Sequence, residues 1–253
     1  WVKSNKYKIA YAASFGTEQF EGNKELCEKA KYFFKRFQKF SVREESGVSL
    51  AKDVFDIDTK WVLDPVFLCD KSLYENMARI GKLRLPKEHY VGAYILDPTQ
   101  DRADLIKELA EKKCSGNALA VIDKDGYPNG DFQWSIETLK NVKNEEWLAT
   151  IANSDFFITD SFHGTVFSVL FNKQFVVYNR YNNKNKNSTN SRIDTLLLKI
   201  ELENRRVLNN CSTEESVNIL LGAIDYSKVN FKVSELKSES IEYLKCVLKE
   251  CDK

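Results

Sequence analysis

Residues 156–165 read Phe-Phe-Ile-Thr-Asp-Ser-Phe-His-Gly-Thr, and this stretch decides the fold class. The apolar residues 156–158 are typical of a buried strand, and Asp160 or Ser161 is a residue type that caps the helix that follows. A buried strand that leads directly into a helix is typical of a parallel α/β sheet. Because ligands of such sheets lie beyond the carboxyl ends of the strands, the turn after Thr159 is the predicted ligand site.

Strand and helix patterns alternate along the chain on both sides of this stretch. In the first helix, Leu26, Ala30, Phe33 and Phe37 recur at helical spacing. The predicted strands are residues 7–13, 40–42, 61–63, 90–96, 118–122, 156–159 and 175–178. The predicted helices are residues 22–38, 48–54, 99–114, 145–153, 162–171, 191–199, 213–222 and 234–250. Strands separated by helices of this length favour right-handed crossovers and parallel sheets.

The alternation predicts an α/β fold with two Rossmann-like lobes, of which the first is incomplete. Residues 1–85 are predicted to form a partial N-terminal lobe and linker, and the charged stretch 71–88 is interpreted as the connection between the lobes. Residues 86–232 are predicted to form the C-terminal, ligand-binding lobe. A C-terminal helix within residues 233–253 is expected to pack back on the first lobe. Residues 182–190, rich in Asn and Lys, are expected to form a solvated loop.

Composition excludes several classes of protein. The 253 residues carry 38 Lys and Arg against 37 Asp and Glu, so little positive charge is available for a nucleic-acid phosphate backbone. No apolar run reaches the ~18 residues that a membrane-spanning helix needs. The six dispersed cysteines form no CxxC pair and the chain has two histidines, which argues against a zinc site and favours reduced cysteines in the cytoplasm. The chain begins at Trp1 with no signal-peptide pattern and no initiator Met, so we expect an N-terminal truncation.

His163 is the candidate catalytic residue. It falls in the first turn of the helix after Thr159, where free backbone N–H groups favour an anion. The helix dipole is expected to lower its pKa and leave a neutral imidazole suited to proton transfer. Gly164 beside it would let a ligand approach the backbone closely. The alternative is a histidine that only packs at the helix end, and for Asp160 and Ser161 helix capping is an alternative to a role in the reaction.

Two arginines are candidate anion-binding residues. Arg43 follows a strand and precedes a helix, where the dipole disfavours a cation unless an anion is present. The alternative is an ion pair with Glu44 or Glu45. Arg192 repeats the situation at the start of a later helix that Ser191 or Asn190 could cap, and for it too both ligand binding and a structural role stay open.

In several short motifs, including those around His163 and Arg43, the sequence resembles the polysaccharide pyruvyl transferase family. The resemblance runs from about residue 7 to about residue 205, and the Ser191-Arg192 helix start fits it as well. The matching stretches are Ile9-Ala10-Tyr11-Ala12-Ala13-Ser14-Phe15-Gly16, Ser41-Val42-Arg43-Glu44, Leu63-Asp64-Pro65 and Asp160-Ser161-Phe162-His163-Gly164-Thr165. The resemblance implies a two-lobed fold like that of GT-B glycosyltransferases. Because family members have a further segment before the first of these stretches, it also implies a truncated N-terminal lobe.

The resemblance implies transfer of pyruvate from phosphoenolpyruvate to two hydroxyls of one sugar, which forms a cyclic ketal on an exopolysaccharide or capsule glycan. The family's motif histidine corresponds to His163, as the catalytic residue, and its motif arginine to Arg43. The substrate-binding residues so implied are Arg43, Asp160, Ser161, Gly164, Thr165 and Arg192. Neither a metal nor a cofactor is expected, because arginines can stabilise the departing phosphate. The expected partners are phosphoenolpyruvate and a glycan or lipid-linked sugar, at the membrane periphery, with no nucleic acid.

Two other functions fit the same residues. A GT-B glycosyltransferase could bind a nucleotide sugar, with the diphosphate at the start of the helix after Thr159 and His163 against the donor sugar. Alternatively, the chain could be a non-catalytic scaffold in glycan assembly whose first lobe has lost its function. Preference for a nucleoside diphosphate over phosphoenolpyruvate would indicate the first, and full function without His163 the second.

Overall fold

A computed structural model describes residues 6–81, 85–86, 88–122, 135–139, 141–179, 190–207 and 212–250. The chain forms two compact units. Unit 1 consists of residues 1–69, 181–201 and 228–253, and unit 2 of residues 70–180 and 202–227. Both units contain parallel sheets with helices, which confirms the predicted α/β class. The domain boundaries at residues 85 and 232 stay a prediction.

Unit 2 is built on six parallel strands in the order β6-β5-β4-β7-β8-β9. They are β4 (Val91–Ile95), β5 (Ala118–Ile122), β6 (Glu137–Leu139), β7 (Phe156–Thr159), β8 (Gln174–Tyr178) and β9 (Arg206–Val207). From β4 the chain first adds strands on one side and then, from β7 onward, on the other. The switch point of this doubly wound sheet therefore lies between β4 and β7, where such sheets bind ligands.

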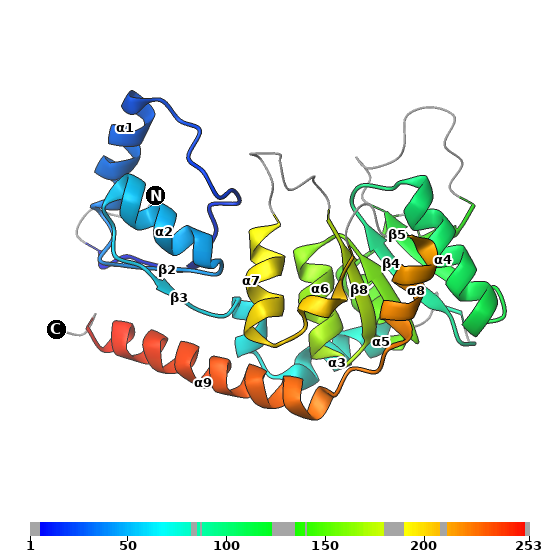
Figure 1. Cartoon of the computed structure of the whole chain (residues 1–253). Coiled ribbons are helices and arrows are strands. Elements are labelled where there is room, and N and C mark those ends of the chain that lie inside the picture. The colour runs from blue at the N-terminus through cyan, green and yellow to red at the C-terminus, as the bar shows by residue number, and fades with distance from the viewer. Residues whose placement is uncertain are drawn as a thin grey trace. The chain divides into compact units, whose positions relative to one another are not determined.

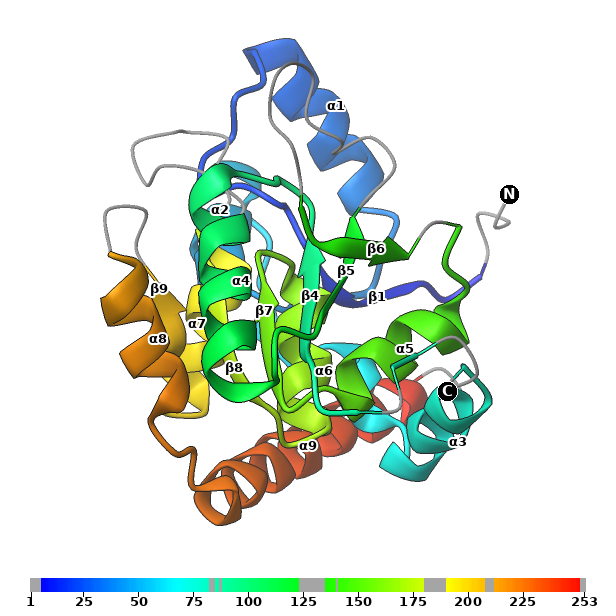
Figure 2. The same cartoon turned by 90° about the vertical axis from the view of Figure 1, so that its right-hand side faces the viewer.

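Helices cover both faces of this sheet, as Figures 1 and 2 show. One face holds α4 (Gln100–Lys113) and α8 (Thr213–Leu221). The other holds α5 (Asn144–Asn153) and α6 (Phe162–Leu170), with α3 (Lys71–Gly81) against α5. A short helical turn at Glu203–Arg205 precedes β9. Unit 2 is thus a three-layer α/β/α arrangement.

The central strand β4 is buried on both faces. Val91, Ala93 and Ile95 pack in the same core cluster as the apolar side chains of α4. Tyr94 points the opposite way, and its ring lies 5.3 Å from the ring of Trp147 in α5. A strand with helices on both faces has no solvent side, which explains why residues 91–95 are apolar throughout rather than alternating.

Unit 1 has a parallel sheet of three strands in the order β1-β2-β3. Its elements are β1 (Ile9–Ala13), α1 (Lys24–Phe34), β2 (Lys39–Val42), α2 (Glu45–Phe55), β3 (Lys60–Trp61), a helical turn (Pro65–Leu68), α7 (Ser191–Lys199) and α9 (Tyr226–Lys249), whose first two residues belong to unit 2. The core of unit 1 is aromatic. The ring of Phe55 lies 5.8, 5.1 and 5.0 Å from the rings of Phe15, Phe20 and Phe34.

Distant parts of the sequence complete unit 1. Ser240 of α9 accepts a hydrogen bond from the Leu63 amide at 3.0 Å, and Tyr243 of the same helix donates to the Phe40 carbonyl at 3.0 Å. Thr195 of α7 accepts one from the Glu45 amide at 3.2 Å. The sheet near the start of the chain is therefore stabilised by helices from near its end.

The structure differs from the sequence-based assignment at several elements. The stretch 71–88, interpreted as a connection, contains helix α3, on which Leu73 and Ile80 are 52% and 68% exposed. Strands β6 and β9 were not predicted, because three and two residues are too few to show a period. The predicted loop 182–190 lies outside the described residues except for Asn190. Within the described residues, no helix has the length and apolar character that crossing a membrane requires.

The contact between α3 and α5 gives a first testable prediction. A Cβ atom on Gly81 would overlap the carbonyl oxygen of Glu145 in the first turn of α5. We expect Gly81→Ala to lower the free energy of unfolding by about 1–3 kcal/mol, measured by urea denaturation. Ile80→Ala is the matched control, because Ile80 is 68% exposed, and should change it by less than about 0.5 kcal/mol. Equal stability of both variants would contradict this packing.

Candidate active site

The side chain of Asp160 joins the two turns at the switch point. Its Oδ1 accepts a hydrogen bond from the Leu96 amide at 2.7 Å, and its Oδ2 accepts one from the Asp97 amide at 2.9 Å. Leu96 and Asp97 follow β4, whereas Asp160 follows β7. The carboxylate is 3% exposed. It does not cap α6 but ties the β4–α4 turn to the β7–α6 turn.

A buried arginine completes this arrangement. Arg102, in the first turn of α4, is 4% exposed. Its Nη1 donates to Asp160 Oδ2 at 3.0 Å and to the Asp97 carbonyl oxygen, and its Nη2 donates to the Asn179 carbonyl oxygen at 2.8 Å. The guanidinium carbon also lies 5.5 Å from the centre of the Tyr178 ring. One guanidinium therefore bonds to the chain just beyond β4, β7 and β8.

Sequence analysis did not identify Arg102, although the sequence contains a signal for it. Arg102 stands at helical spacing from Leu105, Ile106 and Leu109, all of which are buried. A cation on the apolar face of a helix must be paired, because an unpaired buried charge is very costly. The sequence could have indicated that Arg102 belongs to a buried ion pair, but it could not have indicated which residue is the partner.

Ser161, Gly164 and Thr165 build the first turn of α6. Ser161 is the N-cap, and its Oγ accepts a hydrogen bond from the Gly164 amide at 3.3 Å. Thr165 is fully buried and donates to the Ser161 carbonyl at 3.0 Å. A Cβ atom on Gly164 would overlap Oγ1 of Thr159, which donates to the Tyr94 carbonyl. Glycine thus lets α6 begin directly against the end of β7.

His163 is the exposed side chain of this turn. Asp160, Ser161, Gly164 and Thr165 are all buried, whereas His163 is exposed, in the first turn of α6 as the sequence predicts. Its ring lies 5.3 Å from the ring of Phe162 in an edge-on arrangement. The turn is held by hydrogen bonds of Asp160, Ser161 and Thr165, and it exposes the imidazole of His163 at the carboxyl end of the sheet.

Arg43 lies at the carboxyl end of the unit 1 sheet. Its Nη1 is 2.6 Å from Asp64 Oδ2, and the Asp64 side chain is 2% exposed. Asp64 Oδ1 accepts a hydrogen bond from the Val66 amide at 3.0 Å. The ion pair is therefore with Asp64, three residues beyond β3, and not with either neighbouring glutamate. The Arg43 side chain is 18% exposed, so solvent reaches part of it.

The motif residues around Arg43 gather at the same edge. Glu44 is fully buried, and its Oε1 accepts a hydrogen bond from the Phe15 amide at 2.7 Å. The Tyr11 hydroxyl donates to the Leu63 carbonyl at 3.0 Å, and burial raises the pKa of Tyr11 to about 12. Tyr11 therefore stays protonated near neutral pH and does not serve there as a base. The three strands of unit 1 thus end in one hydrogen-bonded cluster.

Arg192 is the second residue of α7 and is half-buried. Residues three apart share a helix face, so it lies on the same face as Thr195, which contacts Glu45 at the start of α2. Arg43 and Arg192 belong to unit 1, whereas residues 160–165 belong to unit 2. The structure therefore brings the predicted residues together in two groups, one in each unit.

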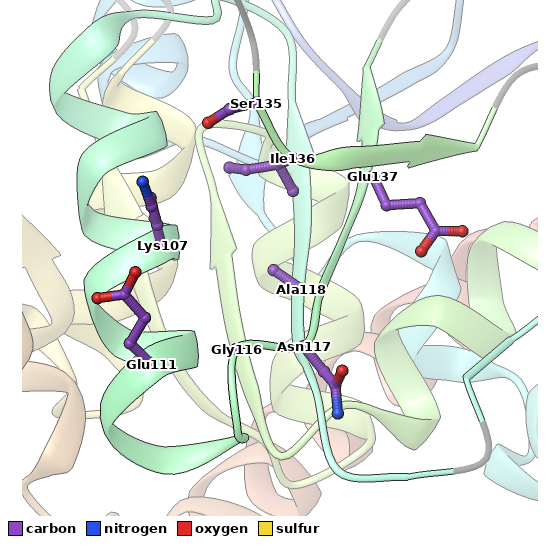
Figure 3. A pocket seen from close by; sticks show the side chains of 8 residues that line it. All are labelled: Lys107, Glu111, Gly116, Asn117, Ala118, Ser135, Ile136 and Glu137. Carbon is purple, nitrogen blue, oxygen red and sulfur yellow. The ribbon is translucent and has the colours of Figure 1, made fainter.

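A pocket of about 310 Å³ lies elsewhere in unit 2 (Figure 3). Lys107 and Glu111 of α4 line one side of it, and residues 116–118 and 135–137 line the rest. These last two segments contain the amino ends of β5 and β6, the opposite end of the sheet from the turn at 160–165. The pocket is therefore separate from the candidate site. Among the described residues, no three His, Cys, Asp or Glu side chains form a group that could hold a metal ion.

Comparison with known proteins gives one family match. A model of the family "Polysaccharide pyruvyl transferase" matches residues 1–183. No curated protein matches the chain. This match covers the motif residues of both units up to and including residues 160–165, but it ends before Arg192.

Several solved structures are similar at low sequence identity. Wall teichoic acid polymerase TagF is 10% identical with a TM-score of 0.48, over 100% of this chain and 67% of that chain. UDP-GlcNAc 2-epimerase from Neisseria meningitidis is 12% identical with a TM-score of 0.44, over 83% and 62% of the two chains. The N-terminal domain of Candida albicans trehalose-6-phosphate phosphatase is 10% identical with a TM-score of 0.47, over 88% and 62%. The chain spans about two thirds of the polymerase and less of the other two.

The contact of Gly164 with Thr159 predicts a coupled pair of substitutions. Gly164→Ala should lower the free energy of unfolding by about 1–3 kcal/mol, because the added methyl group displaces the Thr159 hydroxyl. In the double variant with Thr159→Ala this overlap is relieved. A double-mutant cycle from urea denaturation should therefore give a favourable coupling of about 0.5–3 kcal/mol. Additive effects would show that the two residues do not press on each other.

The second histidine predicts a pH effect. His89 lies before β4, and its Nδ1 is 2.9 Å from Asp155 Oδ1. This hydrogen bond, assisted by the charge of Asp155, raises the pKa of His89 above 6.5. The stabilisation from this pair is therefore fully present below the pKa of the unfolded state and is lost as pH rises through the higher folded pKa.

An NMR titration of the ring protons measures this pKa directly, because the chain has only two histidines. We expect Asp155→Asn to return the pKa of His89 toward its ordinary value. Titration of wild-type His89 at or below that value would contradict the ion pair.

Proposed function

The chain belongs to the polysaccharide pyruvyl transferase family, a family of transferases, and on this premise we propose that it transfers pyruvate from phosphoenolpyruvate to a sugar of a cell-surface polysaccharide. The product is a cyclic pyruvate ketal on two hydroxyls of one sugar. The observation that best supports this is the exposed imidazole of His163 at the switch point, in a turn whose other polar side chains are buried and hydrogen-bonded.

The reaction needs two proton movements, for which His163 is suited. One sugar hydroxyl adds to C2 of phosphoenolpyruvate, and the proton that it loses is delivered to C3, which becomes a methyl group. The second hydroxyl then displaces inorganic phosphate from C2, and its proton leaves with the phosphate. A histidine can take up the first proton and return it to C3, because imidazole exchanges protons near neutral pH.

Arginines suit the two anionic groups of the donor. Phosphoenolpyruvate carries a phosphate and a carboxylate, and guanidinium groups bind both through paired hydrogen bonds. We assign donor binding to Arg43, with Arg192 assisting. Asp64 orients the side chain of Arg43, and that side chain is 18% exposed, so an anion in solution can reach it. Such arginines would stabilise the departing phosphate without a metal.

The remaining motif residues have a more indirect part in this proposal. Asp160, Ser161 and Thr165 direct their side chains to protein partners. We expect them to contribute to substrate binding by fixing the start of α6, and Gly164 by bringing that helix close to β7. The backbone of this helix start favours an anion.

The setting of the reaction is also a proposal. We infer an acceptor that is an exopolysaccharide or capsule glycan or its lipid-linked precursor, reached at the periphery of a membrane. The described cysteines that are free, Cys27, Cys69, Cys114 and Cys246, suit the reducing conditions of the cytoplasm.

Calorimetric titration with phosphoenolpyruvate and, in parallel, with a uridine diphosphate sugar tests the function. We expect the wild type to bind phosphoenolpyruvate more tightly than the uridine diphosphate sugar.

A turnover assay tests the role of His163. His163→Ala should lower turnover by about 10²–10⁴-fold, which is the contribution of a general acid–base residue. His89→Ala is the matched control, because it removes the other histidine, which is exposed and lies before β4 at the amino end of the sheet.

Each outcome has a distinct meaning. Binding of the nucleotide sugar alone would assign the chain to glycosyl transfer and the start of α6 to a diphosphate. Binding of neither would favour a scaffold in glycan assembly. Undiminished turnover in His163→Ala would remove His163 from the mechanism even if phosphoenolpyruvate binds.

A further inference from the structure

We propose that Arg102 is a positioning residue, which holds the turn that carries His163 in its reactive place through Asp160. This inference rests on the proposed function. It concerns a residue that lies outside every motif noted in the sequence. The guanidinium reaches Asp160 Oδ2 at 3.0 Å, and Asp160 directly precedes Ser161, the N-cap of α6.

The position of the ion pair favours this role over a contribution to stability alone. A buried ion pair costs so much desolvation that apolar residues of similar volume often replace it without loss of stability. The buried face of α4 is otherwise apolar, and its one described cation stands where the helix begins, beside the switch point. This buried pair of an arginine and an aspartate lies at the carboxyl end of the sheet, where the position of a side chain affects a reaction most.

The number of acceptors explains why the residue is an arginine. Its two terminal nitrogens reach the Asp97 carbonyl, Asp160 Oδ2 and the Asn179 carbonyl, which lie beyond β4, β7 and β8. A guanidinium is planar and presents five N–H groups in a fixed fork. A lysine has one nitrogen at the end of a flexible chain and cannot hold all three acceptors in the same geometry. Arg102 thus fixes strands on both sides of the switch point.

The connection to His163 is short and stiff. Asp160 is three residues from His163, and the intervening Ser161 is fixed by its own hydrogen bond to the Gly164 amide. If Asp160 moves, the start of α6 moves with it. A displacement of about 1 Å in a catalytic group can cost about 10²-fold in rate. Loss of the Arg102 fork should therefore reduce turnover much more than it weakens donor binding, which the proposed function assigns chiefly to Arg43 of unit 1.

Arg102→Lys tests the inference, with Arg205→Lys as the matched control. Arg205 is also in unit 2 and 2% exposed, and it donates to the Ile219 and Gly222 carbonyls at 2.6 Å. Both substitutions keep a positive charge and remove a buried fork, so both lower stability to a similar extent. Thermal melts measure that loss, and all rates are recorded well below the melting transition of each variant.

Two readouts separate positioning from stability. We expect Arg102→Lys to lower kcat by about 100-fold with KM for phosphoenolpyruvate within about threefold of wild type, and Arg205→Lys to leave both unchanged. In NMR spectra the ring signals of His163 should shift in Arg102→Lys, while those of His89 stay in place as an internal reference. Arg102→Met, which has an apolar side chain, should lower kcat in the same way even if it melts as the wild type does.

The inference is overturned if Arg102→Lys keeps the wild-type kcat and His163 signals while it loses as much stability as Arg205→Lys. That result would make Arg102 a structural residue only. A wild-type chain that neither binds nor uses phosphoenolpyruvate would contradict the proposed function instead. In that case the His163 signals alone decide whether Arg102 positions the turn: a shift supports it, and unchanged signals reject it.

Discussion

The buried carboxylate of Asp160 is the constraint on which the candidate site depends. The hydrogen-bonded ladder between β4 and β7 ends at the pair Tyr94 and Thr159. Beyond this pair the two segments of the chain diverge toward α4 and α6. Asp160 extends the connection past this point by accepting two amides of the opposite turn. Without such a bridge, the two turns of a switch point would be free to separate, and the residue presented between them would have no fixed position.

The residues of this turn differ in their surroundings, because most are buried and hydrogen-bonded to the backbone whereas one is exposed. Thr159 donates to a carbonyl of β4, Ser161 and Thr165 bond with backbone groups at the start of α6, and Gly164 leaves room for the Thr159 side chain. A helix start that is buried needs such partners, because its first amides have none within the helix. These hydrogen bonds bury the polar side chains around His163, whereas His163 itself is exposed.

In unit 1, too, side chains connect the segments that follow the strands, but the residues are different. The ends of its three strands are joined by Glu44, which holds the Phe15 amide, and by the ion pair between Arg43 and Asp64. Helices α7 and α9, from late in the chain, form hydrogen bonds with the start of α2 and with residues in or next to the strands. Two motifs that are 21 residues apart in the sequence thus meet in one cluster.

The sequence by itself determined the alternation of strands and helices, the parallel sheets and the place of His163 in a helix start, because these depend on local periodicity and capping. It did not reveal which face of a helix is buried: Leu26 and Phe33 of α1 have helical spacing yet are 51% and 45% exposed. Nor did it pair Arg102 with Asp160, which lies 58 residues away. Only the tertiary structure decided these, because partners across a sheet depend on strand order, and strand order is set by the packing of the whole unit.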